Sequence, residues 1–229
     1  INFVKRFAAD RDLASDHPWI PTVGEPTGKR IAVVGAGPSG LSAAFYLALA
    51  GHSVVVFERQ PEAGGMMRYG IPEYRLPKAT LDAEIGIIAS MGVRILTGKS
   101  IGTHLHLEDL QSDFDAVYLA IGSWRATPMQ INGENSPGVW LGINYLEKVT
   151  KGDDPELGKN VVVIGGGNTA IDCVRTAVRK GAERVRLVYR RTRAEMPADP
   201  HEIAEAIAEG VEMIFLAAPN AIERVDDRL

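Results

Sequence analysis

The chain has 229 residues, of which 45% are hydrophobic and 24% are charged, and its formal net charge is -4. This length predicts one large domain or two small ones, and this apolar fraction excludes an intrinsically disordered chain. The negative charge argues against a nucleic-acid partner, and no apolar run approaches the ~20 residues that a membrane-spanning helix requires. The single cysteine excludes an internal disulfide and a cysteine-ligated metal cluster built from this chain alone, so we expect a cytoplasmic protein.

The N-terminal half predicts a helix, an extended segment and then a β-α-β unit. Residues 1–12 carry apolar side chains at helical spacing, and the stretch 18–28, with its prolines and glycines, predicts an extended segment that lies over a surface. Apolar strands at 30–34 and 53–57 flank an apolar helix at 39–50. Continuous apolar strands of this kind are typical of a parallel sheet covered on both faces. Further along we expect a helix at 78–91 and strands at 93–97 and 116–121.

The same arrangement recurs after a connecting stretch at about 126–158. We expect strands at 161–164, 185–189 and 211–216, with helices at 168–180 and 200–209. The two β-α-β units begin their turns 130 residues apart, at Gly35 and Gly165, which indicates a duplication.

A glycine-rich turn follows the first strand of the first unit. Residues 35–40 read Gly-Ala-Gly-Pro-Ser-Gly and match G-x-G-x-x-G between a predicted strand and a predicted helix. Gly35 permits the tight turn, Gly37 lets a pyrophosphate approach the backbone, and Gly40 lets the helix pack on the strand. Glu58 ends the next strand, where a carboxylate can accept hydrogen bonds from ribose hydroxyls. This turn predicts a dinucleotide site, and the long irregular segment that follows suits a larger flat cofactor.

The second unit carries the variant G-x-G-x-x-A at residues 165–170. When the second strands are aligned as 54–59 with 186–191, Glu58 corresponds to Arg190. Arginine suits a 2′-phosphate, because its planar fork matches the phosphate oxygens. Arg190, Arg191 and Arg193 follow the strand expected at 185–189, and together they predict an NADPH site. The alternative interpretation is a basic edge exposed to solvent.

Three strings resemble one known family: GGMMRYGIPEYRLPK at 64–78, GGGNTAIDC at 165–173 and YRRTRAEMPA at 189–198. They are similar to the flavin and pyridine-nucleotide module of the glutamate synthase small (beta) subunit, which recurs in dihydropyrimidine dehydrogenase and NADH-dependent ferredoxin:NADP oxidoreductase. The resemblance implies an α/β fold with two Rossmann-like, mainly parallel domains, the second inserted in the first. It also implies hydride transfer between NADPH and FAD, with onward electron transfer to an iron–sulfur domain or subunit.

The resemblance also predicts the domain limits. Residues 1–29 form an N-terminal helix and extended segment, 30–128 an FAD-binding domain, and 129–229 the connection and an NADPH-binding domain. Family members carry an iron–sulfur segment upstream and continue beyond this chain's last residue, so we expect a chain truncated at both ends.

Carried over position by position, the resemblance assigns cofactor contacts and neither a catalytic side chain nor a metal ligand. FAD contacts are expected at Gly35, Ala36, Gly37, Pro38, Ser39, Gly40, Glu58, Arg59, Gly65, Met66, Arg75, Ile101 and Gly122. NADPH contacts are expected at Gly166, Gly167, Asn168, Thr169, Arg190, Arg191 and Arg193. The cofactors carry the chemistry, so no protein acid or base is required.

Other chemistry-bearing residues have simpler interpretations. Cys173 lacks a partner cysteine within the chain, which favours a buried thiol over a redox disulfide. His104 and His106 are interpreted as surface or loop residues, and the acids around His201 as the start of a helix. Two functional alternatives remain: a docking domain that uses residues 1–28 to clamp a partner, and the same enzyme working toward NADP reduction.

Overall fold

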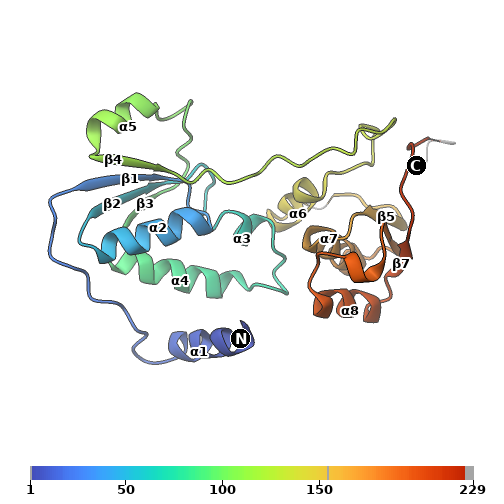
Figure 1. Cartoon of the computed structure of the whole chain (residues 1–229), viewed down its shortest axis with the longest axis horizontal. Helices are drawn as coiled ribbons and strands as arrows, with labels where there is room; N and C mark the ends of the chain where they lie inside the picture. Colours follow the sequence, from blue (N-terminus) through green and yellow to red (C-terminus); the bar gives the residue numbers. More distant parts are fainter. Residues whose placement is uncertain (1, 154, 225–229) are drawn as a thin grey trace. The chain divides into compact units, whose positions relative to one another are not determined.

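The computed structural model describes residues 2–153 and 155–224 and divides the chain into two compact units, Ile1–Ser123 and Trp124–Leu229 (Figure 1). Each unit is built around its own parallel sheet. The predicted α/β class is therefore confirmed. Within the described residues, no helix is both long enough and apolar enough to cross a membrane.

The first unit contains a sheet of strand order β3-β2-β1-β4, in which all neighbours are parallel. Its strands are β1 (Arg30–Val34), β2 (Ser53–Phe57), β3 (Arg94–Leu96) and β4 (Ala116–Leu119). Its helices are α1 (Asn2–Leu13), α2 (Pro38–Leu49), α3 (Met66–Tyr69), α4 (Lys78–Ser90) and α5 (Leu107–Asp113).

The alternation of side chains along β1 and β2 builds two cores in the first unit. Val33, Val54 and Val56 point to one face and pack against α2, with α4 contributing to the same layer. Val34 and Phe57 belong to the other face and pack with Leu110 of α5. Figure 1 shows α2 and α4 on one side of this sheet and α5 on the other. A strand buried on both faces explains the continuous apolar runs in the sequence.

The second unit contains a parallel sheet of order β5-β6-β7. Its elements are α6 (Gly142–Thr150), β5 (Asn160–Ile164), α7 (Asn168–Arg179), β6 (Arg184–Tyr189), the 3-10 turn η1 (Arg193–Glu195), α8 (Pro200–Ala208) and β7 (Glu212–Phe215). Ile171 and Val174 of α7 and Leu187 of β6 are fully buried at the centre of its core. The unit therefore repeats the strand-turn-helix-strand order of the first.

The expected strands lie within two residues of the observed ones, whereas α3, α5 and α6 were not expected. α5 contributes one buried residue, Leu110, and α6 contributes two, Tyr145 and Leu146. The three helices are four, seven and nine residues long, which is shorter than the window of about 11–18 residues over which helical periodicity is read from a sequence. The functional domain limits 30–128 and 129–229, and the insertion of one domain in the other, stay predictions.

Candidate functional site

Two glycines of the first turn are required by close backbone contacts. Gly35 has φ +105°, donates its N–H to the carbonyl of Phe57 at 2.8 Å, and would place a Cβ 2.3 Å from the Ala120 carbonyl oxygen. A Cβ on Gly40 would lie 1.8 Å from the carbonyl oxygen of Gly35. The turn therefore packs directly against β4 and the start of α2, as the G-x-G-x-x-G pattern predicts.

The space beside Gly37 is open, whereas the backbone lies close to Gly35 and Gly40. A Cβ built there would meet one neighbour within 4 Å, the Cα of Gly65 at 3.7 Å. Gly37 is the N-cap of α2, without a side-chain cap, and Pro38 opens the helix. The first N–H groups of a helix lack partners within the helix, and they form a binding site for phosphate. The turn thus fits a pyrophosphate on its backbone.

Glu58 ties the end of β2 to this turn. Its side chain is 4% exposed, Oε2 accepts the N–H of Ala36 at 2.7 Å, and Oε1 accepts the N–H of Gln60 at 2.8 Å. A carboxylate has about four lone-pair sites, so each oxygen keeps one for a ribose hydroxyl. Arg59 follows and is exposed.

The segment 64–78 begins in contact with the same turn. Gly64 donates its N–H to the carbonyl of Ala36 at 2.8 Å, and a Cβ on Gly65 (φ +53°) would lie 2.6 Å from the Cα of Gly37. The buried Arg68 donates Nε to the carbonyl of Ala63 at 2.5 Å and pairs with Asp82 of α4. The structure thus brings together the glycine turn, Glu58 and the start of this segment.

The remaining candidates of the first unit lie further along the chain. Met66 opens α3 and is half-buried, as are Arg75 and Ile101, and Ile101 packs against the α5-side core. Ser39 is exposed at the start of α2, and Gly122 is exposed with φ +69° beyond β4. The hydrogen bonds and close backbone contacts that join the glycine turn, Glu58 and Gly64–Gly65 do not involve Arg75, Ile101 or Gly122.

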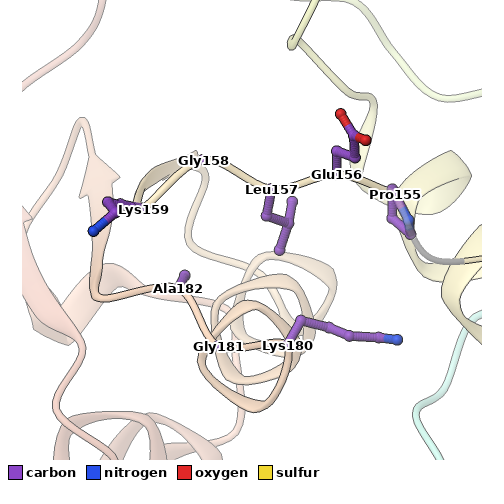
Figure 2. Close-up of a pocket in the computed structure, with 8 residues that line it drawn as sticks. All are labelled: Pro155, Glu156, Leu157, Gly158, Lys159, Lys180, Gly181 and Ala182. Atoms are coloured by element: carbon purple, nitrogen blue, oxygen red, sulfur yellow. The ribbon is translucent and has the colours of Figure 1, made fainter.

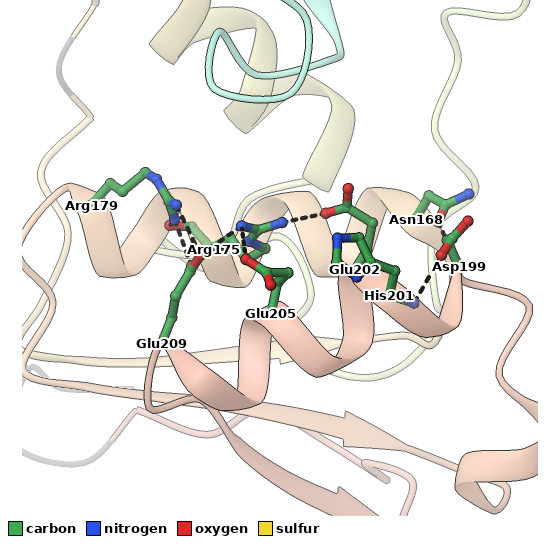
Figure 3. Close-up of polar contacts among 8 residues, drawn as sticks. All are labelled: Asn168, Arg175, Arg179, Asp199, His201, Glu202, Glu205 and Glu209. Atoms are coloured by element: carbon green, nitrogen blue, oxygen red, sulfur yellow. Dashed lines mark hydrogen bonds and ion pairs between the residues drawn. The ribbon is translucent and has the colours of Figure 1, made fainter. Parts of the chain in front are cut away.

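The second turn has the same plan. Gly165, with φ +143°, donates its N–H to the carbonyl of Val188 at 3.0 Å, and Gly167 is the N-cap of α7. A Cβ on Gly167 would meet one neighbour, Pro197 Cγ at 4.0 Å. Asn168 accepts the N–H of Asp199 through Oδ1 at 2.9 Å (Figure 3), and Thr169 is exposed. This helix start also fits a phosphate.

The hydrogen bonds of the two turns correct the alignment of the second strands. Gly35 bonds to Phe57 and Gly165 bonds to Val188, and the strand registers pair Val34 with Phe57 and Ile164 with Val188. The residue that corresponds to Glu58 is therefore Tyr189, not Arg190. The alignment was wrong by one residue because it allowed two extra residues in the second unit, whereas the connection from α7 to β6 (180–183) is only one residue longer than the connection from α2 to β2 (50–52).

Arg190, Arg191 and Arg193 are exposed on the segment that follows β6. We call residues 190–198 the arginine loop. It returns to the second turn, because Ala198 donates its N–H to the carbonyl of Gly166 at 3.2 Å. The three arginines thus lie on a loop that starts and ends beside the glycines. Sequence reasoning missed Tyr189, and the longer α7–β6 connection was the signal that could have located it.

The residues set aside in the sequence have structural roles. Burial raises the pKa of the Cys173 thiol to about 12, so it is protonated at neutral pH. Asp199 caps α8 by accepting the N–H of His201 at 2.8 Å (Figure 3), which confirms the interpretation as a helix start. The described part of the chain contains no group of three His, Cys, Asp or Glu residues that could hold a metal ion.

Figure 2 shows a polar cavity of about 400 Å³ in the second unit. It lies next to the first residue of β5, at the end of that strand away from Gly165. It is lined by residues 155–159 and 180–182. Lys159 immediately precedes β5 and forms an ion pair with Glu183 at 2.6 Å. The cavity includes none of the predicted cofactor residues.

Comparison with known proteins identifies relatives that share this sequence. The NADPH-Fe(3+) oxidoreductase subunit beta of Geobacter sulfurreducens is 46% identical over 220 residues, which cover 91% of this chain and 33% of the relative. The glutamate synthase [NADPH] small chain of Escherichia coli is 38% identical over 236 residues, covering 97% of this chain and 50% of the relative. The chain thus spans between a third and a half of these relatives, and its resemblance to glutamate synthase small subunits is confirmed.

Mycobacterium tuberculosis FprA in complex with NADPH has a similar structure, with a TM-score of 0.74 over 88% of this chain and 62% of that one. At 22% identity this likeness concerns the fold alone. Residues 29–229 match the family model described as pyridine nucleotide-disulphide oxidoreductase. The chain belongs to the pyridine nucleotide-disulphide oxidoreductase family.

Proposed function

We propose that the chain is the nucleotide-binding module of a flavin oxidoreductase that transfers hydride between NADPH and FAD. One observation carries the proposal: two glycine turns of the same plan are followed by different residues. The first is followed by the buried carboxylate of Glu58, and the second by Tyr189 and two exposed arginines. Such a difference is expected between a site for a free ribose hydroxyl and a site for a 2′-phosphate.

FAD binds at the first turn in this proposal. The N–H groups at the start of α2 hold the pyrophosphate, Glu58 accepts the ribose hydroxyls, and the open space beside Gly37 admits the phosphates. Bound flavin supplies the redox chemistry, and the residues of this chain position it. Met66, Arg75, Ile101 and Gly122 are proposed to contact the remainder of the cofactor.

NADPH binds at the second turn. The start of α7, with Gly166, Gly167, Asn168 and Thr169, holds the pyrophosphate in the way that α2 does in the first unit. The guanidinium groups of Arg190, Arg191 and Arg193 bind the 2′-phosphate, for which their planar donor geometry is suited. The position equivalent to Glu58 carries no charge that would repel this phosphate, because it is a tyrosine.

An iron–sulfur domain or subunit is the proposed electron partner. The related proteins from Geobacter sulfurreducens and Escherichia coli are named as a subunit and a chain of NADPH-dependent enzymes, which supports a partnered module. A cytoplasmic location agrees with the single cysteine. The direction of electron flow depends on the reduction potentials of the cofactors in the assembled complex.

The test replaces Arg190 and Arg191 by serine in the full-length protein and measures the dissociation constants of NADPH and NADH. We expect the wild-type protein to carry bound flavin, seen in its absorbance spectrum, and to prefer NADPH. The double variant should lose about 10- to 100-fold of NADPH affinity, because hydrogen bonds to a charged group are lost, and should keep its NADH affinity. Arg184→Ser is the matched control, since Arg184 lies at the other end of β6 and pairs with Glu212 at 2.8 Å. An unchanged preference in the double variant would contradict the assignment.

A further inference from the structure

Tyr189 occupies in the second unit the position that Glu58 occupies in the first, and its side chain makes a different contact with the turn. The Glu58 carboxylate accepts the N–H of Ala36. The Tyr189 side chain is buried, with 9% exposed, and its ring lies against Gly166, where an added Cβ would be 2.5 Å from the ring. Ala36 and Gly166 are equivalent residues of the two turns, so Gly166 leaves the space that the ring fills.

The hydroxyl group of Tyr189 is directed to the arginine loop. It donates a hydrogen bond to the carbonyl of Glu195 at 3.0 Å. Glu195 is the last residue of η1, and its carboxylate accepts both the N–H and the hydroxyl of Thr192, at 3.1 and 3.0 Å. The short turn that contains Arg193 is therefore closed on itself by Thr192 and attached to the sheet by Tyr189.

The arginine loop is also attached to Gly166 at its other end. Ala198 donates its N–H to the carbonyl of Gly166, and Tyr189 packs its ring on that residue. Both ends of the arginine loop are thus fixed relative to the turn at which we place the pyrophosphate. A guanidinium that binds a 2′-phosphate must be held at a set distance from that pyrophosphate, because both groups belong to one nucleotide.

We propose that Tyr189 is a specificity-determining positioning residue, which holds the arginine loop in the conformation that binds a 2′-phosphate. This inference rests on the proposed NADPH site and names the residue that arranges it. Tyr189 acts in two ways. Its neutral ring replaces the carboxylate that would repel a phosphate, and its hydroxyl lowers the freedom of the loop, so less conformational entropy is lost when the nucleotide binds.

The test uses Tyr189→Phe in the full-length protein, which keeps the ring on Gly166 and removes the bond to Glu195. Calorimetric titration with 2′,5′-ADP and with 5′-AMP separates the 2′-phosphate from the rest of the nucleotide. We expect the affinity for 2′,5′-ADP to fall about 3- to 10-fold, the range for one hydrogen bond, and the affinity for 5′-AMP to stay unchanged. Native-state trypsin cleavage after Arg190, Arg191 and Arg193 should become faster in this variant.

Tyr69→Phe is the matched control, because the Tyr69 hydroxyl also donates to a backbone carbonyl, that of Glu62 at 3.3 Å, in the first unit. It should leave the ratio of the two affinities at the wild-type value. If Tyr189→Phe weakens both nucleotides equally, or keeps the wild-type ratio or the wild-type cleavage rate, the positioning role is overturned while the NADPH site stands. If the wild-type protein itself does not prefer 2′,5′-ADP, the proposed function fails and the inference fails with it.

Discussion

At the scale of single residues, Lys78 connects several carbonyl groups of the segment 64–78. Its ammonium donates to the carbonyls of Met67 at 3.2 Å, Ile71 at 2.6 Å and Leu76 at 3.1 Å, which uses its three protons. Its own backbone N–H is held by the carboxylate of Glu73 at 3.1 Å. Burial lowers the pKa of Lys78, and the nearby Glu73 carboxylate opposes this. The ammonium group of Lys78 therefore stabilises the conformation of the segment 64–78.

Replacing Lys78 by methionine keeps an unbranched side chain of similar length and removes all three bonds. We expect the variant to lose about 1–3 kcal/mol of unfolding free energy, because half-buried carbonyls are left without a donor. Urea denaturation of the full-length protein measures this loss. Lys159→Met is the control, since Lys159 is exposed and its ion pair with Glu183 is of the surface kind, worth about 0–1 kcal/mol. Equal losses in both variants would contradict the role of Lys78.

Single residues also show what a sequence motif can and cannot predict. The glycines of both turns and Glu58 were predicted, because the motif specifies a backbone shape and one acid at a set distance. Lys78 was not predicted as a structural cation, since its partners are carbonyl groups that carry no sequence signal. Tyr189 was missed because the alignment of the second strands allowed two extra residues in the second unit, where the structure has one.

At the scale of elements, a network of charges joins α7 to α8 (Figure 3). Arg175 of α7 is 6% exposed, donates Nε and Nη2 to Glu209 at 3.0 and 2.6 Å, and pairs with Glu202. Arg179 donates to the two oxygens of Glu209 at 2.6 and 2.8 Å. Asn168 and Asp199 join the amino ends of the same helices. The helix that opens at the second turn is thus fixed to α8 along its length.

This network makes a pH dependence testable. Hydrogen bonding to Arg179, together with the hydrogen bond and charge of Arg175, lowers the pKa of Glu209 to about 2. The folded pKa lies below the ordinary value of 4.5, so the stabilisation is complete above about pH 4.5 and is lost as the pH falls toward 2. Glu209→Gln should remove about 1–2 kcal/mol at pH 6 after allowance for solvent screening, and less at pH 3.

Unfolding free energies of wild type and Glu209→Gln, measured by denaturant at several pH values between 3 and 6, give the size of this effect. Glu183→Gln is the control, because Glu183 pairs with Lys159 on the surface with 64% of its side chain exposed. A difference between wild type and Glu209→Gln that stays constant from pH 6 to pH 3 would rule out the ionisation of Glu209 as its cause.

Element predictions succeeded where a long segment buries many of its side chains. The helix α7 buries residues 170–177 and was expected to within one residue. The helix α6 was not expected, because it lies in the connecting stretch and packs two buried side chains and Cys173 into a small satellite core. The helical conformation of α6 is therefore stabilised by packing against α7, and such tertiary contacts are not visible in the local sequence.

At the scale of the whole molecule, the duplication gives each unit its own core and its own glycine turn. The core around Ile171 and Leu187 contains residues of the second unit, and the core around Val33 and Val56 contains residues of the first. The pattern of two β-α-β units was readable from the sequence, because each unit repeats strand, turn, helix and strand in the same order. Two separate cores imply that damage to one turn leaves the other unit folded.

The two N-cap glycines provide a matched pair of variants that tests this independence. An added Cβ would meet Gly65 Cα at 3.7 Å in Gly37→Ala, and Pro197 Cγ at 4.0 Å in Gly167→Ala, so both proteins should fold normally. In each case the methyl group enters the space that the pyrophosphate needs. We expect Gly37→Ala to lower the bound flavin content on the order of tenfold and to keep the affinity for NADP, and Gly167→Ala to do the reverse. Flavin absorbance and calorimetric titration with NADP measure the two quantities on the same full-length samples. If either variant reduced both quantities in parallel without a change in melting temperature, the two turns would belong to one shared site rather than to two.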